Sequence, residues 1–196
     1  MTAPAKINFK IYQGSTFNET LRWESSTQVY VPITNIERSA PVVITAPGHN
    51  VPLEWRVKVT NVSGMTEINS SDTYYQVTAA TEDTITINTI NSLGYKTYNT
   101  GGVVEYNQPI DLTNLVARMQ IRSRLEDDAV IQELTTENGL IIVDNVKKTI
   151  TLTIPALTTA QYAFNNAVYA LELITSGGQV TPFIQGSITL VKEVVR

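Results

Sequence analysis

The chain has 196 residues, a formal net charge of −4 and a pI near 5.0, with 42% hydrophobic and 16% charged residues. This hydrophobic content and small net charge exclude a disordered chain, and the acidic balance argues against nucleic acid as a partner, since phosphate binding needs clustered Lys and Arg. The absence of cysteine excludes disulfides and thiolate metal sites.

The first residues, MTAPAKINFKIYQG, lack the basic segment and apolar core of a signal peptide. No apolar run approaches the roughly 18 residues of a membrane helix. We therefore expect a protein that is made in the cytoplasm and does not enter a membrane.

The first predicted strand contains Ile7, Phe9 and Ile11, which alternate with polar residues. This period of two is typical of a half-buried strand in an antiparallel sheet. Residues 7–30 are expected to supply only two or three strands, too few to cover a sheet face alone. The extended residues 2–7 are a candidate sheet edge for pairing with another chain.

The middle of the chain has short strands separated by polar turns. Five strands in about 65 residues indicate a compact, barrel-like β module with a marginal core of its own. The predicted strands are residues 42–45, 55–59, 74–78, 84–88 and 103–106.

Beyond residue 109 the period of two returns, at residues 117–121 and 150–154. The sequence Ser-Gly-Gly-Gln at 176–179 predicts a tight hairpin, because glycine readily supplies positive φ angles. Residues 158–162 are the best helical candidate, with a threonine hydroxyl available to cap one or two turns. The terminal segment 187–196 is a second candidate sheet edge.

These segments predict an all-β fold, an antiparallel β-sandwich interrupted by a small inserted β-barrel-like module. The sandwich is expected to be discontinuous, built from residues 1–40 and 108–196. The inserted module is expected to span residues 41–107, because insertions are tolerated where the two loop ends lie close together.

Four segments resemble the N-terminal β-sandwich domain of baseplate upper proteins and related small tail proteins of tailed phages. They are IYQGSTFNETLRW (11–23), PIDLTNLVARMQIRS (109–123), ELTTENGLIIVD (133–144) and VYALELITSGGQVTPFIQGSITLVKEVVR (168–196). In that family the first segment is soon followed by the second. Here roughly 80 residues intervene, which agrees with an insertion.

The intervening residues resemble a β module that recurs in phage tail proteins and has a distant likeness to the β-barrel half-domain of ubiquitin-activating enzymes. The segments that carry this likeness are residues 42–69, 74–87 and 94–106. The module's usual Ala-His-Gly-Leu stretch is replaced here by Gly48-His49-Asn50-Val51. No ubiquitin chemistry is implied.

Residues for catalysis are sparse. His49 is the only histidine and lies in a predicted turn without a nucleophile pattern nearby, so we interpret it as a turn or packing residue. The acidic cluster at 126–128 is interpreted as a solvated hairpin loop, with calcium binding as the lesser alternative. We expect that the chain is not an enzyme and that it has no cofactor and no metal site.

Aromatic residues gather in the middle of the chain. Core packing is one interpretation; a protein interface or a sugar-stacking face are the others, because Tyr combines large area with a polar tip. The interface candidates are Trp55, Tyr74, Tyr75, Tyr95, Tyr98 and Tyr106.

The resemblance implies a structural component of a phage virion, located in the tail (baseplate, neck or fibre attachment). Its partners would be other virion proteins, in a symmetric assembly with several copies of this chain. The alternatives are a carbohydrate-binding module of a tail fibre and a head or neck decoration protein. Fold alone does not choose between these roles.

Overall fold

The computed structural model describes residues 3–193 and is nearly all β, with 51% strand and 4% helix. The predicted all-β class is therefore confirmed. The strands are β1 (Ala5–Lys6), β2 (Phe9–Tyr12), β3 (Phe17–Arg22), β4 (Glu24–Pro32), β5 (Asn35–Glu37), β6 (Val42–Thr45), β7 (Arg56–Ser63), β8 (Tyr75–Gln76), β9 (Ala79–Ala80), β10 (Thr84–Ile87), β11 (Thr100–Pro109), β12 (Val116–Arg122), β13 (Val130–Thr135), β14 (Ile141–Asp144), β15 (Thr149–Ile154), β16 (Asn166–Ile174) and β17 (Val180–Val191). The helices are the 3-10 turn η1 (Thr66–Ile68) and α1 (Ala156–Thr159).

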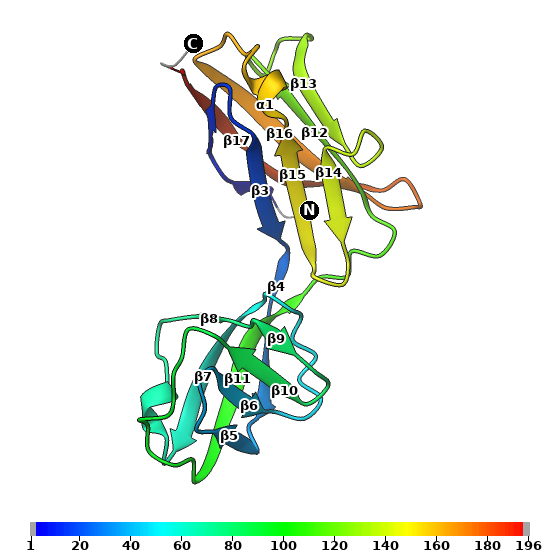
Figure 1. Cartoon of the computed structure of the whole chain (residues 1–196). Helices are drawn as coiled ribbons and strands as arrows, with labels where there is room; N and C mark the ends of the chain where they lie inside the picture. The colour runs from blue at the N-terminus through cyan, green and yellow to red at the C-terminus, as the bar shows by residue number, and fades with distance from the viewer. Residues whose placement is uncertain (1–2, 194–196) are drawn as a thin grey trace. The chain divides into compact units, whose positions relative to one another are not determined.

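The chain divides into two compact units (Figure 1). The first contains residues 1–22, 111–145 and 149–196, and the second contains residues 23–110 and 146–148. The insertion therefore begins at residue 23 rather than at the predicted residue 41. The reason is that β4 pairs along β11, with Val31 opposite Val104, and so belongs to the inserted unit.

The first unit has two sheets. The larger is six-stranded, in the order β1-β17-β16-β12-β13, with β2 also paired to β17. The smaller is three-stranded, in the order β14-β15-β3. Alternate residues such as Met119, Leu171 and Ile150 are fully buried, which is the period of two expected for sheets that each have one covered face.

Strand β17 is not a sheet edge, contrary to the prediction for residues 187–196. It pairs antiparallel with β16 on one side and parallel with β1 and β2 on the other. Ile188 lies opposite Phe9, so the apolar start of the chain covers this side of β17. Residues 2 and 194–196 of the two predicted edges lie outside the described residues.

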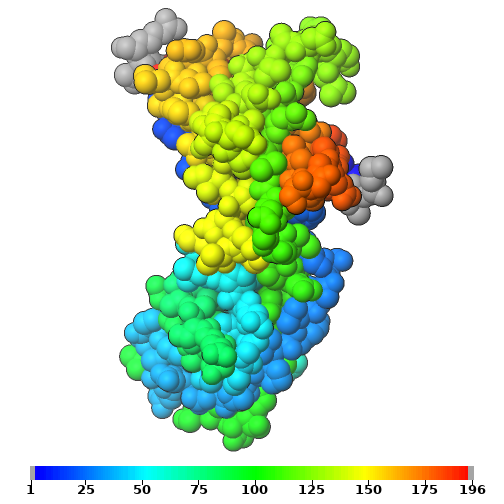
Figure 2. Space-filling view, turned by 90° about the vertical axis from the view of Figure 1, so that its right-hand side faces the viewer, coloured from blue at the N-terminus to red at the C-terminus, as the bar shows by residue number. Residues whose placement is uncertain are grey.

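The predicted hairpin at 176–179 is present between β16 and β17, with Gly178 at a φ of 79°. Its turn projects from the sheet in orange (Figure 1, Figure 2). The helix α1 spans Ala156–Thr159 instead of the predicted residues 158–162, because Pro155 occupies the N-cap position. No side chain caps this helix, so the predicted threonine cap is absent. The hydroxyl of Thr159 instead donates to the carbonyl oxygens of Ser15 and Ala156.

The second unit has two four-stranded sheets, in the orders β4-β11-β7-β8 and β5-β6-β10-β9. The strands that residues 23–110 form do not close into a barrel, so the barrel-like expectation is corrected to two packed sheets. Trp55, Ile44 and Ile85 lie in the hydrophobic core between them. The strand β6 has the predicted bounds, residues 42–45.

Candidate functional site

The aromatic residues proposed as an interface are mostly core residues. Trp55 is 0% exposed and donates from Nε1 to the carbonyl oxygen of Asn107 at 3.1 Å. Tyr106 is buried, and its hydroxyl donates to the carbonyl oxygen of His49 at 2.6 Å. The partly buried tyrosines of the unit pack against the same core; they are Tyr75, Tyr95 and Tyr98.

Tyr74 is half-buried and lies under two cations. The guanidinium of Arg56 is 4.7 Å and the ammonium of Lys58 is 4.8 Å from its ring centroid. Arg56 also donates from Nε and Nη2 to the two carboxylate oxygens of Glu24, at 2.8 and 2.6 Å. Because β4 and β7 lie on either side of β11, this bidentate pair ties these two strands together across it.

His49 is buried, at 1% exposure. Its Nδ1 accepts a hydrogen bond from the backbone N–H of Val51 at 2.9 Å. This bond places the ring proton on Nε2, which donates to the carbonyl oxygen of Thr84 at 3.2 Å. Both ring nitrogens thus bind the backbone and hold the 46–51 turn against β10.

The acidic cluster at 126–128 lies in the loop between β12 and β13. Glu126 and Asp128 are exposed, and Asp127 is half-buried. Across residues 3–193, no three His, Asp or Glu side chains lie close enough together to share a metal ion. In the same range, no helix is long and apolar enough to cross a membrane.

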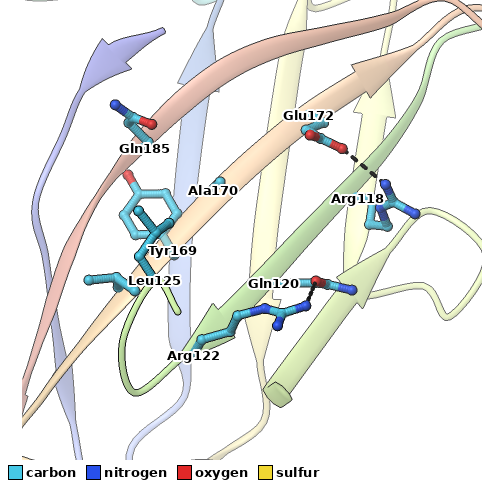
Figure 3. A pocket seen from close by; sticks show the side chains of 9 residues that line it. Arg118, Gln120, Arg122, Leu125, Tyr169, Ala170, Glu172 and Gln185 are labelled. Atoms are coloured by element: carbon cyan, nitrogen blue, oxygen red, sulfur yellow. Dashed lines mark hydrogen bonds and ion pairs between the residues drawn. The ribbon is translucent and has the colours of Figure 1, made fainter. Parts of the chain in front are cut away.

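A different surface carries a hollow of the first unit, on the outer face of the six-stranded sheet. Its central row is Gln120, Ala170 and Gln185, which lie opposite one another on β12, β16 and β17. Ala170 is short while both neighbours are long, so the row dips over β16. A hollow of about 210 Å³ lies along this dip (Figure 3).

The walls of this hollow carry charge, and its floor is apolar. Arg118 and Arg122 project from β12 beside Ala170 of β16, and Leu125 of the loop lies at one end (Figure 3). Val168 also lines the hollow. A second hollow of about 360 Å³ continues from it past β17. The residues shared by the two hollows are Leu125, Val168, Tyr169 and Gln185. We call the joined hollows the trough.

Hydrogen bonds fix the trough walls. Arg118 Nη2 forms an ion pair with Glu172 at 3.0 Å. Arg122 donates from Nη2 to Oε1 of Gln120 at 2.8 Å and from Nη1 to the carbonyl oxygen of Asp127 at 2.6 Å. The second of these bonds holds the acidic loop beside the trough (Figure 3 shows the bond to Gln120).

A third hollow, of about 470 Å³, lies where the segment after α1 meets β13. Tyr162 and Phe164 line it, with ring centroids 5.2 Å apart. The hydroxyl of Tyr162 is buried with no hydrogen-bond partner among residues 3–193, and burial raises the pKa of this phenol to about 12.

Sequence reasoning missed the trough. The alternation of Arg118, Gln120 and Arg122 with buried residues marks them as the outer face of a strand, but it does not reveal which side chains lie opposite. No family model matches the chain, and no curated protein matches it.

Proposed function

We propose that this chain is a structural component of a bacteriophage tail that acts by binding other virion proteins. The proposed location is the baseplate, the neck or a fibre attachment, in several symmetric copies. It would be made in the host bacterial cytoplasm and would act without catalysing a reaction, by surface complementarity and the pairing of sheet edges.

The observation that supports the proposal best is how the phage-like segments fall on the two units. The four segments that resemble the baseplate sandwich domain supply β2, β3, β12, β13, β14, β16 and β17, and most of their residues lie in the first unit. The segments that resemble the recurrent tail module lie wholly in the second. Each resemblance therefore corresponds to one compact unit.

The surface chemistry is compatible with this role. The outer face of the six-stranded sheet has a trough with charged walls and an apolar floor, and β13 and β14 are edge strands in their sheets. Edge strands offer backbone groups to another chain. The carbohydrate-binding alternative needs Tyr and Trp side chains of the inserted unit in an exposed groove; Trp55 and Tyr106 are buried, and Tyr74, Tyr75, Tyr95 and Tyr98 are partly exposed.

Particles released by cells that carry the gene provide the test. We expect peptides of this chain in washed virions, and in tails separated from heads, in a fixed ratio to the tail tube protein. Expression of the gene without its product in washed particles would overturn the structural role. Recovery with heads alone would overturn the tail assignment.

A further inference from the structure

The loop of residues 123–129 and the trough lie on the same face of the first unit. Leu125 is 81% exposed and lines both parts of the trough. Glu126, Asp127 and Asp128 follow it, against the single Arg124 of the same loop. Their carboxylates have no hydrogen bond or ion pair within residues 3–193.

The trough has the opposite character. Lys6, Arg118 and Arg122 line it, against the single carboxylate of Glu172. Arg118 uses one nitrogen of its guanidinium group, Nη2, for Glu172, and Lys6 makes no ion pair within residues 3–193. A cationic hollow thus lies beside an anionic loop, on a chain whose net charge is −4.

We propose that this face binds the same face of a second copy of the chain in a two-fold dimer. Each copy places the acidic residues of its loop against Lys6 and Arg118 of the other. The Leu125 side chain of each copy packs on Val168 and Ala170 of the other copy.

A two-fold arrangement follows because the acidic loop and the cationic trough lie side by side on one face of each copy. When donor and acceptor surfaces lie side by side, two facing copies make both contacts at once and the interface closes. Opposite charges then meet twice, which favours this pairing over like-charged arrangements. The inference concerns the isolated chain and does not depend on the proposed tail function.

Sedimentation equilibrium of the purified full chain tests the pairing with a matched pair of variants. Leu125→Asp and Leu157→Asp each place a charge at a highly exposed leucine, 81% and 83% exposed, so neither threatens the fold. We expect wild type to approach twice the 21.6 kDa monomer mass, L125D to dissociate about tenfold more readily, and L157D to match wild type. A monomeric wild type, or equal effects of the two variants, would overturn the dimer.

A charge exchange tests the pairing of loop and trough. One variant carries Lys6→Glu and Arg118→Glu, and the other carries Glu126→Lys, Asp127→Lys and Asp128→Lys; Arg122 is kept because it holds the loop. Each variant alone is expected to be monomeric, and an equimolar mixture to form a heterodimer, because both contacts are again between opposite charges.

The control is Arg38→Glu with Lys96→Glu, which changes the net charge as much as the trough variant does but at exposed sites of the other unit. It should dimerise like wild type. With circular dichroism showing that each variant is folded, a mixture that stays monomeric would overturn the proposal. A trimer or a larger ring would overturn the two-fold arrangement.

Discussion

The hydroxyl of Tyr169 donates a hydrogen bond of 2.9 Å to the backbone carbonyl oxygen of Ile7. The bond links the central strand β16 to the start of the chain, past β17. Ile7 also donates its N–H to the carbonyl oxygen of Gln185 at 3.0 Å, and Asn8 Oδ1 accepts from the N–H of Ser187. The N-terminal segment is thus held to β17 by backbone and side-chain bonds together.

Two buried tyrosines allow the value of this bond to be measured. Tyr169→Phe should lower the free energy of unfolding by about 1 kcal/mol, because the Ile7 carbonyl loses its phenolic donor. Tyr162→Phe is the matched control, since the Tyr162 hydroxyl has no partner within residues 3–193, and it should cost less than about 0.5 kcal/mol. Urea unfolding checks both; equal losses would mean that the Ile7 bond contributes nothing.

Gly186 packs against the same carbonyl. A Cβ at this position would collide with the carbonyl oxygen and carbon of Ile7, which are backbone atoms and cannot turn away. Gly186→Ala should therefore push the N-terminal strands off β17 and cost roughly 1–3 kcal/mol. Faster hydrogen exchange of residues 5–12 is the specific readout.

The control for this change is Gly177→Ala in the β16–β17 turn. There the nearest atom to an added Cβ is Thr175 Oγ1 at 3.8 Å, an ordinary contact. Its stability and exchange should match wild type. If G186A exchanged as slowly as G177A over residues 5–12, the close packing of Ile7 on β17 would be refuted.

Stability should fall at alkaline pH because of the buried phenols. Burial raises the pKa of Tyr162 from 10.0 to about 12 and also raises the pKa of Tyr169. The folded state therefore favours the neutral phenols. The contribution of these phenols to the free energy of unfolding is complete below pH 10. It is lost as the pH rises through their raised folded-state pKa values.

Absorbance of tyrosinate against pH, with circular dichroism in parallel, measures this loss. Tyr162→Phe should remove part of the fall in unfolding free energy between pH 10 and 12. An intact fold in which all nine tyrosines ionise near pH 10 would contradict the prediction.

Trp55 should behave as a core residue. Trp55→Phe leaves a cavity and removes the donor to the Asn107 carbonyl, so we expect a loss of roughly 2–3 kcal/mol. Tyr30→Phe is the control, because Tyr30 is exposed and its hydroxyl donates to Gln28 Oε1 on the surface. A W55F variant as stable as wild type would contradict the burial of Trp55 in the core.

The sequence alone determined the strands whose faces differ in polarity. Residues 117–121 lie in β12 as predicted, because Ala117, Met119 and Ile121 are buried and alternate with Arg118 and Gln120. β4 was missed as a strand of the inserted unit, since ESSTQVYVP buries little except Val31 and so carries a weak alternation. The aromatic residues were found, but their burial was not, because composition is the same for a core and an interface.

What only the tertiary structure decided is which residues meet across strands. The first unit's sheet places Ala170 between Gln120 and Gln185, and Ile7 against Gly186, across separations that no local pattern encodes. The period of two assigns each side chain to a face of its strand, because successive residues point to opposite sides. The register and order of the strands are set by long-range packing, and these create the trough and pair both sides of β17, which the sequence alone predicted to be an open edge.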